Sequence, residues 1–227
     1  MISVKYLRDN LNSELRKGQG GYFSDEEFNG FLKSAQVTAF EYFINEKAKA
    51  SKQAVDALSP FLKSETLTYT NGIADFPTDY YHSDTMLFTW VENECDGIVI
   101  EQIPMPFITQ SEYSAYIKDA LRKPNIRKKR VYYSFLNGKI EAYPKSITSS
   151  DFIYYRPPNE AIYASNIITT PNGSFEQFDA LSSVDLEWNV AQQEVFMDLL
   201  LFYSGISLRE NSVVQYAQIK QKEGLIR

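Results

Sequence analysis

The chain has 227 residues, of which 44% are hydrophobic and 23% are charged, values typical of a globular protein. It carries 29 acidic and 23 basic residues, a net charge of −6. This charge argues against a nucleic-acid-binding domain, because such domains usually have a basic excess. The single cysteine and single histidine exclude an internal disulfide, a cysteine-cluster metal site and a two-histidine metal site. The length suits one domain with an insertion, or two small domains.

The N-terminal residues, MISVK, lack the basic segment and the apolar core of a signal peptide. The longest nearly apolar run, residues 195–203, is interrupted by Asp198 and is far shorter than the roughly 20 residues of a membrane-spanning helix. We therefore expect a soluble protein that is not exported through a signal peptide and has no membrane partner.

Helical periodicity dominates the first quarter of the chain. Apolar residues spaced three and four apart predict three helices, over residues 3–17, 24–50 and 52–62. Gly18 is expected to end the first helix. Ser24 and Glu27 have the spacing of a capping box, which indicates that the second helix begins at this point.

Beyond residue 63 the hydrophobic period changes to two, which is typical of β-strands. The expected strands are residues 65–70, 85–92, 96–102, 130–135, 139–143, 152–156 and 162–169. Asn71-Gly72 and Asn137-Gly138 are strong turn signals, and the second predicts a hairpin with a type I′ turn. One helix interrupts this section, from Gln110 to about residue 122, and begins with a second capping box at Thr109 and Glu112.

The chain then returns to helical spacing. Ser182 and Asp185 have the capping-box pattern a third time and predict a helix that reaches Ser204, with Gly205 as its C-cap. A last helix is expected over residues 211–222. We therefore predict an α+β fold in which residues 1–62 and 181–227 form one helical bundle. Residues 63–180 would be a β-rich insertion containing one helix.

No catalytic constellation emerges from the sequence. His82 stands beside Ser83 and Asp84 without a nucleophile-elbow motif, so it is interpreted as a structural residue. Cys95 lies between two acidic residues that oppose formation of a thiolate. Two carboxylate pairs have spacings that could serve a glycosidase, Asp75 with Asp79 and Glu92 with Glu94. Such pairs arise by chance in an acidic chain, and we predict no catalytic, cofactor-binding or metal-ligating residue and no enzyme activity.

One basic cluster stands out from the acidic chain. Its members are Arg122, Lys123, Arg127, Lys128, Lys129 and Arg130. The simplest interpretation is a solvated connection between a helix and a hairpin. The alternatives are a salt-sensitive contact with the phosphate backbone of DNA, a contact with an acidic protein, or a contact that closes a ring against the negative face of the next subunit.

Three segments and a helical pair carry a resemblance to a known family. The segments are residues 75–80, DFPTDY; residues 137–144, NGKIEAYP; and residues 152–158, FIYYRPP. The expected helices over residues 184–204 and 209–223 follow them. In this order the pattern resembles the head-to-tail adaptor (connector) proteins of tailed bacteriophages, and most closely the ring proteins of crAss-like and other podophages.

The resemblance implies a structural virion protein without catalysis or cofactors, made in the host cytoplasm. The expected assembly is a twelvefold ring at the head–tail interface, with the portal protein on one side and the next ring or tail protein on the other. Genomic DNA would pass through the ring without sequence recognition. Docking on the portal would use the C-terminal segment, including Val213, Tyr216, Ile219, Lys220, Leu225 and Arg227.

Two other function classes stay open on the sequence. Tyrosine occurs 16 times and combines an apolar ring with a polar hydroxyl, as recognition surfaces require. A tyrosine-rich β section could therefore bind carbohydrate or peptide. A glycosidase or peptidase would instead need a carboxylate pair with perturbed pKa values.

Overall fold

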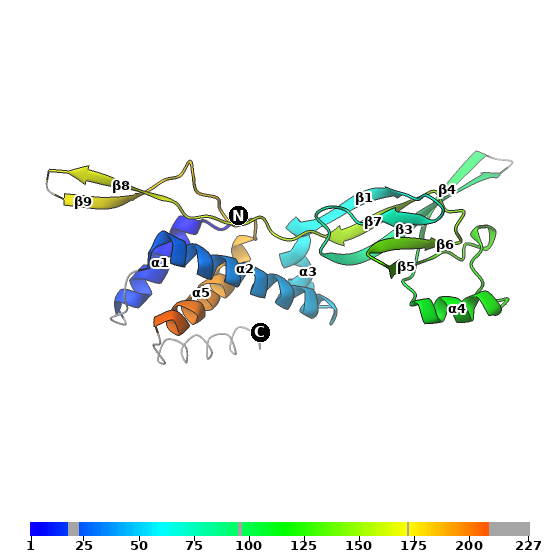
Figure 1. Cartoon of the computed structure of the whole chain (residues 1–227), viewed down its shortest axis with the longest axis horizontal. Helices are drawn as coiled ribbons and strands as arrows, with labels where there is room; N and C mark the ends of the chain where they lie inside the picture. The colour runs from blue at the N-terminus through cyan, green and yellow to red at the C-terminus, as the bar shows by residue number, and fades with distance from the viewer. Residues whose placement is uncertain (18–22, 95–96, 172, 209–227) are drawn as a thin grey trace. The chain divides into compact units, whose positions relative to one another are not determined.

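The computed structural model describes residues 1–17, 23–94, 97–171 and 173–208. Within them the chain is a mixed α+β protein with antiparallel sheets, as predicted at the level of fold class (Figure 1). The chain divides into two compact units. The first unit comprises residues 1–60 and 158–227, and the second unit comprises residues 61–157.

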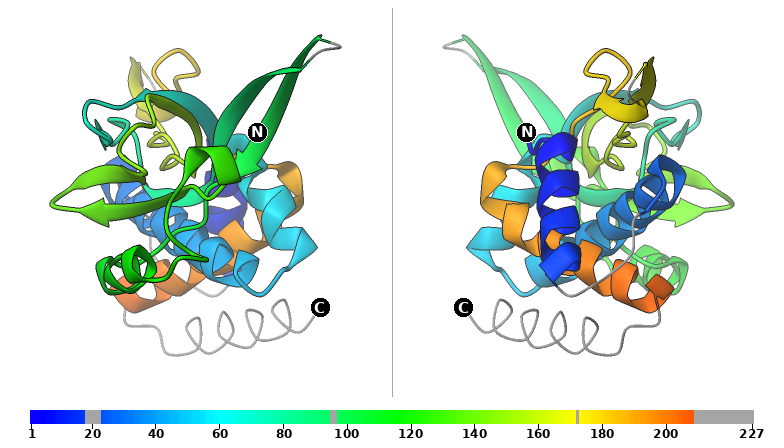
Figure 2. Two further views of the ribbon diagram at one scale, coloured as in Figure 1. Left: turned by 90° about the vertical axis from the view of Figure 1, so that its right-hand side faces the viewer. Right: turned by 90° about the vertical axis from the view of Figure 1, so that its left-hand side faces the viewer.

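The first unit is mainly helical. Its elements are α1 (Val4–Lys17), α2 (Asp25–Lys47), α3 (Lys52–Leu58), the short helix η3 (Val190–Gln192) and α5 (Gln193–Leu208). Helices α2 and α5 lie side by side, and α1 also contacts α5 (Figures 1 and 2). The capping box at the start of α2 is confirmed, because the Ser24 hydroxyl accepts from the Glu27 amide while the Glu27 carboxylate accepts from the Ser24 amide.

Aromatic rings fill the centre of the first unit. Trp188 is fully buried, and its ring lies 5.7 Å from that of Phe43 on α2 and 5.3 Å from that of Phe196 on α5. Such aromatic contacts add to the stabilisation that comes from burying apolar area. Trp188 therefore links the two longest helices of the unit.

Two amide side chains of α2 hold an extended segment against the helix. Asn29 donates to the carbonyl of Tyr163 at 2.9 Å and accepts from its amide at 2.8 Å. Two helical turns further on, Gln36 donates to the carbonyl of Asn159 at 3.1 Å and accepts from the amide of Ala161 at 3.2 Å. Each side-chain amide thus both donates to and accepts from the backbone of residues 159–163, as a neighbouring β-strand would. These bonds satisfy backbone polar groups that lie beside the core.

The first unit also carries a two-stranded hairpin, β8 (Ser165–Thr170) with β9 (Gly173–Phe178). The sequence predicts a strand near β8 but not β9. Because the units divide at residues 157/158 rather than at the expected 180/181, this hairpin belongs to the first unit and not to the β-rich section.

The prediction that a helix begins at Ser182 is wrong. The Ser182 hydroxyl instead donates to Asp179 at 2.7 Å, and the Asp185 carboxylate accepts from the amide of Val4, the first residue of α1, at 2.9 Å. The capping-box side chains are thus used by a turn and by a distant helix. Helix α5 begins at Gln193 and continues through Gly205, so the predicted C-cap is also wrong. The helix expected over residues 211–222 lies outside the described residues.

The second unit contains two antiparallel sheets. One has the strand order β1 (Leu62–Thr68), β7 (Ser149–Tyr155), β3 (His82–Glu94) and β4 (Gly97–Pro104). The other has the order β2 (Ile73–Asp75), β6 (Lys139–Tyr143) and β5 (Tyr132–Leu136). Helix α4 (Gln110–Lys118) and the short helix η2 (Ile126–Lys128) lie between β4 and β5 in the chain.

The local signals of this unit are confirmed. Asn137 and Gly138 have φ values of 52° and 70°, as a type I′ turn requires. Thr109 and Glu112 form the capping box at the start of α4, with both reciprocal hydrogen bonds present.

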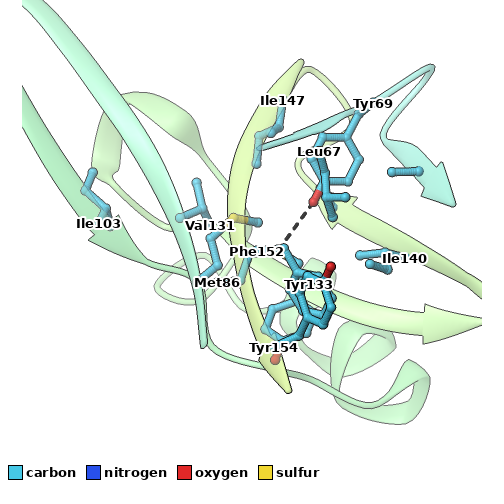
Figure 3. Close-up of a cluster of buried hydrophobic side chains, with 13 residues drawn as sticks. Leu67, Tyr69, Met86, Ile103, Val131, Tyr133, Ile140, Ile147, Phe152 and Tyr154 are labelled. Atoms are coloured by element: carbon cyan, nitrogen blue, oxygen red, sulfur yellow. Dashed lines mark hydrogen bonds between the residues drawn. The ribbon is translucent and has the colours of Figure 1, made fainter. Parts of the chain in front are cut away.

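The core of the second unit lies between its two sheets (Figure 3). Phe152 and Met86 are fully buried cross-strand partners on β7 and β3. The Tyr69 hydroxyl lies 3.3 Å from the Met86 sulfur and 2.7 Å from the Ser150 hydroxyl, so this buried polar group is satisfied inside the core. The remaining members are Leu67, Ala74, Ile103, Met105, Val131, Tyr133, Ile140, Ala142, Ile147 and Tyr154.

Candidate functional surface: a basic loop and a β-ribbon

The predicted basic cluster forms an ordered loop, residues 122–130, between α4 and β5. Asn125 caps the short helix η2 by accepting from the amide of Lys128 at 3.2 Å. Lys129 then takes a left-handed conformation with φ of 55°, and Arg130 pairs with Asn125 through backbone hydrogen bonds of 2.9 and 3.0 Å. The loop therefore closes on itself.

Three side chains attach the basic loop to the second unit. Ile126 packs against the core. The Arg130 guanidinium donates to the carbonyl of Ala120 at 3.2 Å, and the Lys129 ammonium forms an ion pair with Glu101 on β4. These two cations of the predicted cluster thus have structural contacts inside the chain.

The other cations of the basic loop face solvent. Arg122 lies 3.7 Å from Asp119 and over the ring of Tyr116. Lys123, Arg127 and Lys128 are exposed, and among the described residues no carboxylate forms an ion pair with them. The cluster predicted as one site therefore divides into two anchoring cations and a group of exposed ones.

Exposed apolar side chains lie next to these cations. Helix α4 has no buried residue, and Ile117 and Leu121 are 44% and 76% exposed. The helix is held in place by Tyr113, which stacks on Tyr143 with ring centroids 3.7 Å apart, and by Gln110, which donates to Tyr143 at 3.1 Å. The surface around the basic loop is thus both cationic and apolar.

A β-ribbon projects from the same unit. Strand β7 pairs with β3 only over residues 82–87, whereas β3 and β4 remain paired out to Glu94 and Gly97. Residues 88–94 and 97–103 therefore form a two-stranded extension, which we call the β3–β4 ribbon (Figures 1 and 2). At its base Phe88, Trp90 and Ile103 still pack against the core. Its cross-strand partners Val91 and Ile100 are 57% and 68% exposed.

Of the two carboxylate pairs weighed for acid–base chemistry, Asp75 with Asp79 has structural partners instead, and the side chains of Glu92 and Glu94 lie outside the described part of the chain. Asp79 accepts from Lys63 at 2.5 Å and from the buried Tyr154 hydroxyl at 2.7 Å, and these hydrogen bonds hold the pKa of Asp79 below its ordinary value. A general acid of a glycosidase needs a raised pKa. Asp75 pairs with Lys139 at the surface. Asp79 is therefore a structural carboxylate that satisfies Tyr154.

The lowered pKa of Asp79 predicts a pH-dependent stability. Because the folded-state pKa lies below the unfolded value of about 3.9, the contribution of Asp79 is present above that value and is lost as the pH falls through the folded pKa. We expect Asp79→Asn to remove this part of the acid destabilisation. The measurement is the protection of β7 peptides from hydrogen exchange between pH 6 and pH 3. The control is Asp75→Asn, at an exposed position, for which protection should fall with pH as steeply as in the wild type.

The remaining sequence-predicted residues divide into two groups. His82 is an exposed residue at the start of β3. Cys95 lies outside the described residues, as do all six residues predicted to dock on the portal, which are Val213, Tyr216, Ile219, Lys220, Leu225 and Arg227. The sequence did not single out Val91 and Ile100. Their exposure depends on the point at which β7 stops pairing with β3, and that point is a property of the folded sheet.

Half of the ten tyrosines of the second unit belong to its interior. Five of them are at most 6% exposed, namely Tyr69, Tyr133, Tyr143, Tyr154 and Tyr155. Burial raises the pKa of Tyr154, and its hydrogen bond to Asp79 raises it further. These five rings build the core of the unit, and the other five, among them the exposed Tyr81, lie nearer its surface.

No protein-family model matches the chain, and no curated protein matches it. Across the described ranges, no group of three or more His, Cys, Asp or Glu side chains is placed to hold a metal ion. The helices in the described part of the chain are too short or too polar to cross a bilayer.

Proposed function

We propose that the protein is a structural virion component that assembles with copies of itself into a twelvefold ring in the neck of a tailed bacteriophage. In this proposal the ring lies between the portal protein and the tail, and genomic DNA passes through it. The helices of the first unit would form a bundle made from both chain ends, with residues 61–157 inserted between them.

The observation that carries the proposal is the β3–β4 ribbon. An exposed two-stranded extension with unpaired edges and apolar side chains is costly for a protein that remains a monomer. The cross-strand pair Val91 and Ile100 on such a ribbon is instead suited to burial against a neighbouring subunit. A protein that closes into a ring by side-to-side contacts needs an interaction surface of this kind.

The segments on which the resemblance rests also meet in space. Tyr80 of the first segment stacks on Phe152 of the third with centroids 5.7 Å apart, and Asp79 accepts from Tyr154. Residue Asp75 pairs in register with Lys139 of the second segment. The three segments thus build one core, which supports reading them together as a single fold signature.

The location in the virion gives a direct test. An antibody against the full chain, applied to purified phage particles from the same genome, is expected to label the head–tail junction in electron micrographs. Label along the tail, on the capsid shell or on no part of the particle would contradict the proposal. Heads purified from a mutant that lacks the portal protein serve as the control and should bind no antibody.

A further inference from the structure

The basic loop, residues 122–130, concentrates the positive charge of the second unit. It holds six of the unit's eleven basic residues and none of its acidic ones. Outside the loop the unit has twelve acidic and five basic residues. The chain as a whole lacks the basic excess of a nucleic-acid-binding domain, but salt screens charges farther away than about 10 Å. The loop can therefore attract a polyanion locally.

The fold gives the basic loop a fixed backbone before any partner binds. Asn125 caps η2, and its backbone pairs with that of Arg130. The Arg130 guanidinium donates to the carbonyl of Ala120, and Ile126 packs against the core. A loop that is already ordered loses less conformational entropy when a partner binds. The exposed cations are thus held on a preformed support.

Three cations of the basic loop have no carboxylate partner in the described part of the chain. Lys123, Arg127 and Lys128 are exposed, and none of the ion pairs among the described residues includes them. Ammonium and guanidinium groups form charge-assisted hydrogen bonds with phosphate oxygens. Lys129 and Arg130 differ, because they attach the loop to the unit. An anionic partner is therefore expected to contact Lys123, Arg127 and Lys128.

The surroundings of these cations favour a nucleic-acid backbone over a membrane. A helix that lies in a membrane surface needs a large apolar face. Helix α4 has nine residues, and of the exposed Ile117 and Leu121 only Ile117 lies within it. The helix also exposes Ser111, Glu112 and Ser114. Its surface is therefore too polar for membrane insertion.

The same surface offers little to a protein partner. A stable protein interface has an apolar core surrounded by a polar rim. Ile117 and Leu121 are two aliphatic side chains, and scattered exposed side chains of this kind are normal on protein surfaces. A phosphate backbone needs only the cations.

We propose that the basic loop contacts the phosphate backbone of double-stranded DNA through Lys123, Arg127 and Lys128. Phosphate contacts position a duplex but carry no sequence information. In a ring each copy would present the same three cations. Many weak contacts would then hold the DNA in position and still let it slide. This inference rests on the proposed function, because DNA is the polyanion that would pass each subunit.

A salt titration of DNA binding tests the contact. Fluorescence anisotropy of a labelled duplex oligonucleotide of random sequence gives the association constant of the full chain. The titration runs from about 50 to about 200 mM salt, a range over which phosphate contacts change the affinity strongly. The test variant is K123Q/R127Q/K128Q. The control variant, K33Q/K49Q/K52Q, removes three exposed charges from the first unit. Thermal melting checks that both variants are folded.

We expect the wild type and the control variant to bind with the same salt dependence. Each phosphate contact adds about 0.9 to the slope of log K against log salt concentration, so the test variant should lose about 2.7 of that slope. At the lowest salt concentration its affinity should fall at least about tenfold. Leu121→Ser should bind DNA as the wild type does, because an aliphatic side chain forms no bond with phosphate.

Two results would show that the loop does not contact DNA: an unchanged slope in the test variant, or a wild-type chain that does not bind the duplex at low salt. Antibody labelling of the virion would still decide the neck assignment independently. Co-sedimentation with phosphatidylglycerol vesicles covers the membrane alternative. If vesicle binding is lost in both the test variant and Leu121→Ser while DNA binding is unchanged, the loop is a lipid contact and the inference is wrong.

Discussion

Replacement of Arg8 by methionine is expected to lower the free energy of unfolding of the first unit by about 3 kcal/mol. Arg8 is only 5% exposed, and its guanidinium pairs with Asp25 at 2.9 Å and donates to the carbonyl of Phe23 at 3.0 Å. It also lies 4.5 Å from the centre of the Tyr163 ring. The methionine side chain fills similar space but leaves the carboxylate without its cation.

The size of this effect follows from the environment of Asp25. Its side chain is 28% exposed, so water relieves part of the unpaired charge and the loss falls at the low end of the range for buried pairs. The matched control is Lys5→Met, which removes an ion pair with Asp9 whose side chains are 51% and 58% exposed. That change should leave the free energy of unfolding close to the wild-type value, because water screens an exposed ion pair.

Urea unfolding followed by tryptophan fluorescence measures the loss. The chain has two tryptophans, Trp90 in the second unit and Trp188 in the first, so a Trp90→Phe background reports the first unit alone. The double variant R8M/D25N should recover part of the stability, because it removes the unpaired charge as well. A loss below about 1 kcal/mol for Arg8→Met would contradict the role assigned to the ion pair.

Phe152→Ala is expected to destabilise the second unit by about 3–5 kcal/mol. The Phe152 ring is fully buried on β7, stacks on Tyr80 and lies 5.5 Å from the ring of Tyr154. Truncation to alanine removes apolar contacts with all of these and leaves a cavity between two sheets that cannot easily close.

The neighbouring residue supplies the control for this prediction. Ile153 points to the opposite face of β7 and is only half-buried, so Ile153→Ala should cost about 1 kcal/mol. Hydrogen exchange of peptides from β3 and β7 measures both changes. Equal losses of protection in the two variants would show that Phe152 is not the centre of the core.

The sequence predicted those elements whose signals are local. The capping boxes at Ser24 and Thr109 and the turn at Asn137-Gly138 occur where expected, because each is completed by atoms within three residues. Ser182 shows the limit of such signals. The same residue pattern there is used by a turn at Asp179, and Asp185 caps a helix that lies 181 residues away in sequence.

The candidate surface could be predicted only in part. Basic residues 122–130 were visible as a cluster, but the ion pair between Lys129 and Glu101 spans 28 residues and depends on the folded sheet. Strand β9 lacks a run of β-branched residues and follows a proline-containing turn, so periodicity did not reveal it. The backbone pairing of Asn29 with Tyr163 likewise needs the tertiary fold, since these residues are 134 positions apart.

Native mass spectrometry of the full chain, alone and mixed with the portal protein of its own genome, tests the central claim most directly. The account predicts a species of twelve copies that forms, or is stabilised, in the presence of the portal. A chain that remains monomeric with and without the portal, at concentrations where the portal itself is assembled, would contradict it.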